Sequence, residues 1–155
     1  MTRPRLLAAA VVLLALAVAL GSVLLARGAD ATVAARADAL EAATARVPDL
    51  LSYDRGTLER DLDRARDQTT GAFADDYRAI LADVVEPTAR RRGLSTEASV
   101  SAAGVVRGDR DEVVVLVFLT QTTTVKGRSS VSGSRLEVTM RRTDDSWKIA
   151  GLDPV

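Results

Sequence analysis

The pattern of apolar and polar positions begins with one long uncharged run. Leu6 to Ala26 contains no charged residue over 21 positions, which is enough for a helix to cross the hydrocarbon core of a bilayer. Arg3 and Arg5 precede the run, whereas only Arg27 follows it before the first acid. The positive-inside rule then places the N-terminus in the cytoplasm. We expect a single-pass protein of the cell membrane with an extracytoplasmic domain.

A cleaved signal peptide is the alternative interpretation of this run. Ala29-Asp30-Ala31 resembles a small-x-small cleavage site. The apolar region of a signal peptide usually spans only about 7 to 15 residues, so the length of the run favours an anchor. The prediction therefore divides the chain into a cytoplasmic tail 1–5, a transmembrane helix 6–26, a stalk helix 27–48 and a domain 49–155.

Helical periodicity follows the apolar run. Val33 to Arg46 repeats apolar positions at steps of three and four, and Pro48 predicts a break or kink. Thr57 is the expected N-cap of a second helix that ends near Asp67. The predicted inward residues are Val33, Ala37, Leu40 and Thr44 or Val47 in the first helix, and Leu58, Leu62 and Ala65 in the second.

A third helix is expected from Ala72 to about Arg92. Pro87 predicts a bend in it, and Gly93 predicts its end. Its predicted buried face consists of Phe73, Tyr77, Ile80, Leu81, Val84 and Val85.

From Ser95 the apolar period changes to two, which is typical of strands. Four strands are expected, over 98–107, 112–124, the alternating segment 135–141, and 147–152. Turns are predicted at Gly108-Asp109, at Lys126-Gly127-Arg128-Ser129 and at Thr143-Asp144-Asp145-Ser146. Three helices followed by an antiparallel meander of four strands predict an α+β fold.

The second strand has apolar residues on both faces. Val113, Val115, Val117 and Leu119 alternate with Val114, Leu116 and Phe118. The helices can cover only one face of such a sheet, so we expect the other face to be shielded by sheet curvature, a partner chain or a ligand.

Composition excludes several classes of function. The chain has no Cys and no His, so the usual ligands of zinc, haem and iron–sulfur clusters are missing, as are His- and Cys-based catalytic triads. We expect no cofactor. Beyond Arg27 the chain carries 18 basic and 21 acidic residues, a weak negative charge that argues against nucleic acid as a partner.

The order of elements resembles a SnoaL-like cone, the fold shared with nuclear transport factor two. Local motifs are similar to those of the Mce-associated membrane protein family of actinobacteria, over roughly 49–155. The motifs are Tyr53-Asp54…Thr57-Leu58, Thr70-Gly71-Ala72-Phe73…Tyr77, Gly104-Val105-Val106, Val115-Leu116-Val117-Phe118, Gln121-Thr122-Thr123-Thr124, Arg135, Trp147 and Leu152-Asp153-Pro154.

This resemblance implies a non-enzymatic accessory subunit that stabilises or assists an Mce-type lipid or sterol transport complex. The expected partners are the membrane, through 6–26, and Mce subunits or a second copy of the chain, with lipid as a further candidate. Two alternatives stay open. One is an inner-membrane scaffold of a type IV secretion or conjugation system, and the other is a lipid carrier that uses the cone cavity.

Six residues are candidates for partner or cavity contacts: Phe118, Gln121, Thr123, Arg135, Trp147 and Tyr77. The segment Gln121–Thr124 is either a recognition edge or, more simply, a strand leaving the core. The aromatic residues are either cavity walls or ordinary core. Arg90-Arg91-Arg92 either contacts anionic lipid headgroups or complements a helix dipole.

The acidic residues suggest an enzymatic alternative. Some cone-fold proteins use an Asp–Arg–Asp arrangement to activate water, and Asp54, Asp61, Asp75, Asp76 and Arg135 supply the residue types. Asp61, Asp75 and Asp76 lie among charged neighbours on predicted helices, where a solvated position is usual. We therefore expect no enzyme.

Overall fold

The computed structural model describes residues 29–144 and 146–155, and the chain divides into two compact units after Ala34. Of the first unit, residues 29–34 are described, and they are helical. The predicted tail and the predicted anchor at 6–26 lie outside the described residues. Among the residues that are described, no helix is both long and apolar enough to cross a membrane.

The second unit, Ala35–Val155, begins with helical residues 35–51. It continues with α2 (Leu58–Asp67), α3 (Gly71–Ile80), the π-helical turn η1 (Leu81–Val85) and α4 (Glu86–Arg92). The helix expected over 72–92 is thus interrupted by a π-helical turn just before Pro87, where the proline lacks the N–H of a regular helical turn. Gly93, with φ 63°, ends α4 as predicted.

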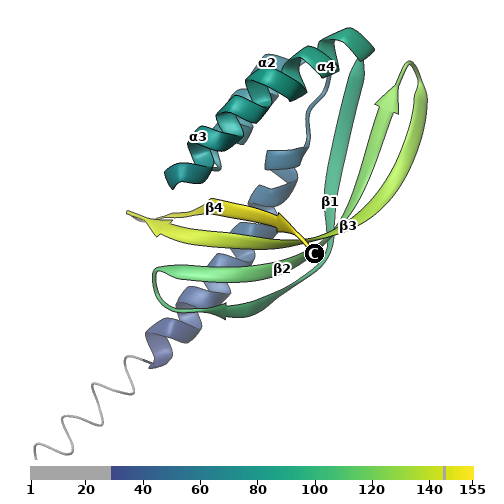
Figure 1. Cartoon of the computed structure of the whole chain (residues 1–155). Coiled ribbons are helices and arrows are strands. Elements are labelled where there is room, and N and C mark those ends of the chain that lie inside the picture. Colours follow the sequence, from purple (N-terminus) through teal and green to yellow (C-terminus); the bar gives the residue numbers. More distant parts are fainter. Residues whose placement is uncertain (1–28, 145) are drawn as a thin grey trace, which may run out of the picture. The chain divides into compact units, whose positions relative to one another are not determined.

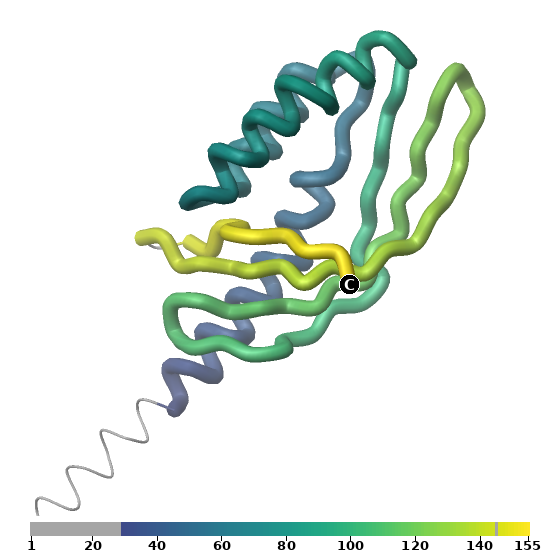
Figure 2. The backbone as a smooth tube through the Cα atoms, in the orientation of Figure 1, coloured from purple at the N-terminus to yellow at the C-terminus, as the bar shows by residue number. Residues whose placement is uncertain are grey.

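Four strands form one antiparallel sheet in the order β1-β2-β3-β4, so the predicted α+β class and meander are confirmed. The strands are β1 (Leu94–Gly108), β2 (Glu112–Val125), β3 (Arg128–Thr143) and β4 (Ser146–Pro154). Lys126 and Gly127 make a two-residue turn between β2 and β3, with φ of 50° and 79°. The long strands bend near their middle, so the tip of the β2–β3 hairpin turns away from β4 (Figures 1 and 2).

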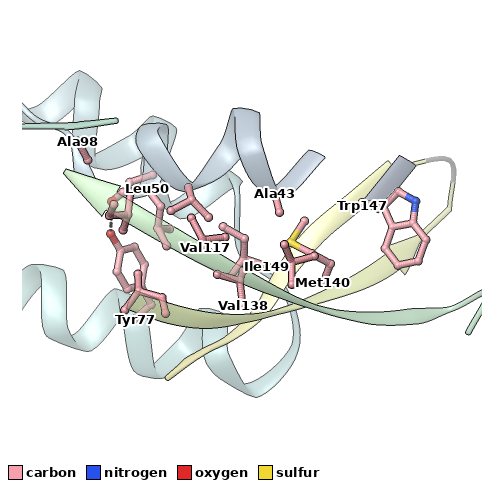
Figure 3. Close-up of a cluster of buried hydrophobic side chains, with 14 of the residues drawn as sticks. Ala43, Leu50, Tyr77, Ala98, Val117, Val138, Met140, Trp147 and Ile149 are labelled. Carbon is pink, nitrogen blue, oxygen red and sulfur yellow. Dashed lines mark hydrogen bonds between the residues drawn. The ribbon is translucent and has the colours of Figure 1, made fainter. Parts of the chain in front are cut away.

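The core lies between one face of this sheet and the helices (Figure 3). Val113, Val115, Val117 and Leu119 of β2 are almost completely buried on this inner face. The predicted inward residues of α2 are confirmed, because Leu58, Leu62 and Ala65 are all buried.

The buried face of the helix of residues 35–51 matches the predicted one only in part, at Val47 and at half-buried Leu40. Its buried residues are Ala35, Ala39, Ala43, Val47 and Leu50, whereas Val33, Ala37 and Thr44 are exposed. Alanines every four residues allow a helix to pack close to a sheet, but they give only a weak apolar signal in the sequence. The helix also continues past Pro48 to residue 51, and its burial places residues 35–48, predicted to be a stalk, within the compact unit.

The predicted buried face of the third helix is only partly correct. Tyr77 and Leu81 are buried, but Ile80 and Val84 are 49% and 58% exposed. The wider η1 turn adds backbone between α3 and α4, and residues spaced by four face the core, namely Tyr77, Leu81, half-buried Val85 and Ala89.

Candidate interaction surface

The outer face of the sheet is the surface that the helices of this unit leave uncovered. Its apolar row on β2 runs from Val114, which is buried, through half-buried Leu116 to Phe118, which is 40% exposed. The sequence predicted that this row needs shielding. The structure shows that shielding decreases along the strand towards Phe118.

An ion pair covers the first part of this row. Arg107 on β1 lies opposite Val114, and Glu137 on β3 lies opposite Leu116. The Arg107 Nη1 and Glu137 Oε2 atoms are 3.7 Å apart, so their side chains cross β2 between its two neighbours. Long charged side chains can cover apolar surface in this way while their charged ends stay in water. The ion pair therefore shields Val114 and Leu116 without the help of another protein chain.

Phe118 lies beyond this cover. Its neighbours across the strands are Ala102 on β1 and Arg135 on β3. Ala102 is too small to cover an aromatic ring, and Arg135 is itself exposed. Farther along the hairpin on the same face, Val131 is 68% exposed. An exposed aromatic residue beside an arginine is the composition that protein interfaces favour.

Two of the predicted contact residues, Phe118 and Arg135, are thus adjacent on this outer face, which we call the Phe118 surface. The predicted pair Gln121 and Thr123 is different. Both are half-buried and lie on the central strand β2, which is paired with β1 and β3 on its two sides along this segment. The recognition-edge alternative is therefore excluded, because the backbone of a central strand is already paired on both sides, and the simpler interpretation, a strand leaving the core, remains.

Tyr77 and Trp147 are part of the core, at opposite ends of the cluster drawn in Figure 3. The Tyr77 hydroxyl donates a hydrogen bond of 2.5 Å to the carbonyl of Leu50, and burial raises the pKa of this hydroxyl. Trp147 is 5% exposed, with the Arg142 guanidinium 5.3 Å from its ring centroid. The core interpretation of these two aromatic residues is therefore correct.

A polar cleft of about 560 Å³ lies between the segment Ser52–Arg55, α2, the start of β1 and the tip of the β2–β3 hairpin. Charged and hydroxyl side chains make up most of its lining: Ser52, Tyr53, Asp54, Arg55, Asp61, Arg64, Ser95, Thr96, Glu97, Thr122, Thr124 and Lys126. Such a lining suits a lipid acyl chain poorly, because apolar ligands are held by apolar walls.

Two aspartates in this cleft hold the turn before α2. Asp61 is only 5% exposed, and its Oδ2 accepts hydrogen bonds from the Thr57 hydroxyl at 2.6 Å and the Asp54 amide at 3.0 Å. The Asp54 carboxylate accepts hydrogen bonds from the Gly56 amide and the Ser95 hydroxyl. The predicted N-cap is thus at Thr57, but its hydroxyl donates to Asp61 instead of accepting from the helix backbone. These contacts tie the turn to both α2 and β1.

Electrostatics keep both carboxyl groups ionised. The backbone hydrogen bond from Gly56 and the hydrogen bond from Ser95 lower the pKa of Asp54. Burial alone would raise the pKa of Asp61, but the hydrogen bonds from Thr57 and Asp54, together with the nearby Arg64, outweigh burial and lower this pKa. A general base near neutral pH needs a raised carboxyl pKa, which neither group has.

Of the residues considered for an Asp–Arg–Asp arrangement, only Asp54 and Asp61 lie together, and Arg135 does not join them. Asp75 and Asp76 are exposed on α3, as expected, while Arg135 lies opposite Phe118 on the outer face. Asp61 does not follow the expectation of a solvated position, because the turn before α2 folds over it. In the described part of the chain, no cluster of three acidic residues is placed to hold a metal ion.

The basic triplet Arg90–Arg92 forms the last turn of α4. Arg90 is paired with Glu59 at 2.7 Å and with Glu86 at 2.9 Å. These ion pairs support the simpler interpretation for Arg90, while Arg91 and Arg92 are exposed in the last turn of the helix.

The comparisons with known proteins define the family. A family model described as "Uncharacterized protein Rv1363c/MT1408-like" matches residues 5–155. The chain belongs to this family. A Mycobacterium tuberculosis H37Rv relative, "Outer membrane protein Rv1973", is 40% identical over 127 residues, covering 81% of this chain and 79% of that protein. "Uncharacterized protein Rv1362c", from the same strain, is 38% identical over 108 residues; the match spans 68% of this chain and about half (49%) of that relative.

Solved structures share the fold of this Rv1363c/MT1408-like chain. An IcmL-like type IV secretion system protein from Legionella pneumophila matches with a TM-score of 0.67 at 8% identity, over 77% of this chain and 91% of that one. CagV, a VirB8 homologue from Helicobacter pylori, matches with a TM-score of 0.60 at 12% identity, over 77% and 97%. An NTF2-like protein involved in plasmid conjugation matches with a TM-score of 0.51 at 13% identity, over 78% and 49%. These similarities confirm the predicted cone fold.

Proposed function

We propose that this chain is a non-enzymatic, membrane-anchored assembly subunit whose domain binds another protein of an envelope complex through the Phe118 surface. The observation that carries the proposal is an aromatic residue left 40% exposed on a sheet face whose preceding apolar residues are covered. Unshielded aromatic residues beside arginine are enriched where proteins meet. The anchor at 6–26, with a cytoplasmic N-terminus, is part of the proposal.

Type IV secretion-like assembly is the better supported class of complex. The structural neighbours named above come from secretion and conjugation proteins, although similarity at this level of identity carries the fold only. An accessory role in an Mce-type lipid transport complex is the second candidate, and it rests on the sequence motifs. The name of the relative Rv1973 supports a location in the cell envelope for either complex.

Direct lipid carriage has less support. Its predicted cavity walls, Tyr77 and Trp147, are buried core residues, and the residues that line the cleft are mostly charged or hydroxyl-bearing. We therefore propose that any lipid passes through the partner complex and not through this domain.

Co-purification with a matched pair of variants tests the proposal. Phe118→Asp in the full-length chain, tagged at the N-terminus and extracted in mild detergent, should reduce the recovery of co-purifying subunits at least about tenfold, because loss of an interface anchor costs about 2 kcal/mol or more. Ile80→Asp is the control, since Ile80 is similarly exposed but lies on α3. The emission of Trp147, the only tryptophan, reports that each variant is folded.

The identity of the recovered proteins separates the candidates. Secretion-type ATPase and channel subunits would support the first class of complex, and a permease with Mce subunits would support the second. Equal recovery from Phe118→Asp and Ile80→Asp would overturn the role of the Phe118 surface.

A further inference from the structure

The sheet has three lengths of outer edge, and other segments of the chain protect two of them. On β1, the backbone of Thr96 exchanges two hydrogen bonds with Tyr53, at 2.8 and 2.9 Å, and the Ala98 amide donates to the Ser52 hydroxyl. The rest of β1 carries two register shifts, between Val100 and Ala102 and between Val105 and Arg107. Bulges of this kind prevent another strand from pairing with an edge.

The edge of β4 is protected in the same manner. The Thr70 amide donates to the carbonyl of Ile149 at 2.9 Å, and the Ile149 amide donates to the carbonyl of Gln68 at 2.8 Å. A register shift next to Met140 further distorts the pairing of β4 with β3.

The third length of edge, on β3 at the tip of the β2–β3 hairpin, is open. β4 pairs with β3 only as far as Leu136, and the last hydrogen bond on that side runs from the Val155 amide to the Arg135 carbonyl at 3.1 Å. Successive residues of a strand direct their backbone groups to alternate sides. The backbone groups of Arg135 point away from β2, as its bond with Val155 shows. The backbone groups of Gly133, Val131 and Ser129 therefore point away from β2 as well.

These three residues, which we call the open edge, have no hydrogen-bond partner for their backbone groups among the described residues. The register of β3 with β2 is continuous from Arg128 to Arg141, without a bulge. Between Arg128 and Arg135 there is no charged residue and no proline, which are the usual protections of an edge. The hairpin is closed by its two-residue turn and by a 2.9 Å contact between the Thr124 and Ser129 hydroxyls.

We propose that the open edge pairs with the open edge of a second copy of this chain, antiparallel and in a register centred on Val131. This inference deepens the proposed assembly role and rests on it. The pairing would continue the sheet from one copy into the next by β-strand addition.

The symmetry of the free groups selects a second copy and fixes its register. An antiparallel two-fold axis at Val131 places Val131 opposite its own equivalent and Ser129 opposite Gly133 of the other copy. Every free N–H and C=O of the open edge then finds a partner. Shifting the centre to Gly133 would place Val131 opposite Arg135, whose carbonyl already accepts from Val155.

Charge is compatible with the same register. Arg128 faces Ser134 of the other copy, and Arg135 faces Gly127, so no two arginines are opposed. The paired length is short, and interfaces that bury less than about 1,200 Å² in total are typically weak. We therefore expect a reversible dimer that contributes to a larger assembly.

Cysteine cross-linking tests the register, because the chain has no cysteine of its own. Val131→Cys in the full-length chain should form a disulfide-linked dimer under mild oxidation in membranes, since residues of an antiparallel hydrogen-bonded pair have Cα atoms about 5.5 Å apart. Ser134→Cys is the control. It faces residue 128 of the other copy, which leaves the two 134 positions about 20 Å apart and the cross-link at least about tenfold slower.

A proline variant tests the backbone pairing. Val131→Pro removes only an N–H that points away from β2, a position where edge strands tolerate proline. The dimer fraction of the full-length chain in detergent, measured by light scattering, should fall for Val131→Pro and persist for Val131→Thr, with the emission of Trp147 unchanged in both. An unchanged dimer fraction in Val131→Pro, or equal cross-linking of Val131→Cys and Ser134→Cys, would overturn the self-pairing.

The outcomes also separate this inference from the proposed function. Absent Val131→Cys cross-linking, with recovery of other subunits that still depends on Phe118, would remove the self-pairing and leave the assembly role. Specific Val131→Cys cross-linking, with no other subunit recovered from the wild-type chain, would support the self-pairing and remove the partner complex.

Discussion

Replacing Asp61 should destabilise the domain more than its place among charged residues suggests. The Asp61 carboxylate is 5% exposed and accepts hydrogen bonds from the Asp54 amide and the Thr57 hydroxyl. It also forms an ion pair with Arg64 at 3.1 Å. In Asp61→Ala the partly buried amide and hydroxyl lose their acceptor, while Arg64, whose side chain is 40% exposed, regains water. The loss of stability in Asp61→Ala therefore comes mainly from the two lost hydrogen bonds.

The expected loss is about 2–3 kcal/mol of unfolding free energy, because hydrogen bonds to charged groups contribute about 1.5–3 kcal/mol and adjacent ones do not add fully. For a domain of this size, that loss lowers the melting temperature by on the order of 10 °C. Thermal unfolding of the full-length chain in detergent, followed by the emission of Trp147, measures it. Asp75→Ala is the control, since Asp75 is exposed and forms a surface ion pair with Arg78, whose loss should cost less than about 0.5 kcal/mol.

The pH dependence provides an independent check. The folded-state pKa of Asp61 is lowered, so the folded protein favours the ionised form. This contribution to stability is present above the unfolded-state pKa of about 3.9 and is lost as the pH falls through the lower folded-state value. The stability gap between the wild type and Asp61→Ala should be constant from pH 8 to about pH 5 and shrink below about pH 4. A gap no larger than that of Asp75→Ala, or one that widens in acid, would refute the reasoning.

Two further substitutions test the core and the β1–β2 turn. Tyr77→Phe leaves the buried Leu50 carbonyl without its donor and should cost about 1–2 kcal/mol in urea unfolding; a cost below about 0.3 kcal/mol would contradict this role. Gly108→Ala would place a Cβ 2.6 Å from Val113 Cα at φ 152°, so it should cost more than about 2 kcal/mol. The matched Gly104→Ala meets nothing within 4 Å and should change the melting temperature little, and similar melting temperatures for the two variants would count against the clash.

Local chemistry explains what could be predicted of the fold. The end of α4 at Gly93 and the β2–β3 turn at Lys126-Gly127 depend on residues adjacent in the chain, which adopt left-handed backbone angles. The four strands and their meander order could be predicted for the same reason, because the alternation of period two and the short turns between strands are also local features of the sequence. Phe118 lies on the face of β2 opposite to that of Val113, Val115 and Val117, as predicted, because alternation along a strand fixes the face of each residue.

Contacts between distant segments explain the predictions that were wrong. A recognition edge at Gln121 and Thr123 stayed open as an alternative because the segment is polar, and only the sheet order, which puts a strand on each side of them, excludes it. Asp61 looked solvated because its sequence neighbours are charged, yet the turn at Asp54 covers it. Neither the sheet order nor the fold of the turn is contained in local periodicity.

The sequence by itself determined the α+β class, the number and direction of the strands, and an apolar outer row on the sheet, since each depends on residue periods and turn residues within a short segment. Only the tertiary structure decided that an alanine face of residues 35–51 packs in the core, that Asp61 is buried, and that the open edge at Val131 is the unprotected one. Burial and edge protection depend on which distant segments meet. Free energy summed over the whole fold sets those contacts, and no single segment encodes them.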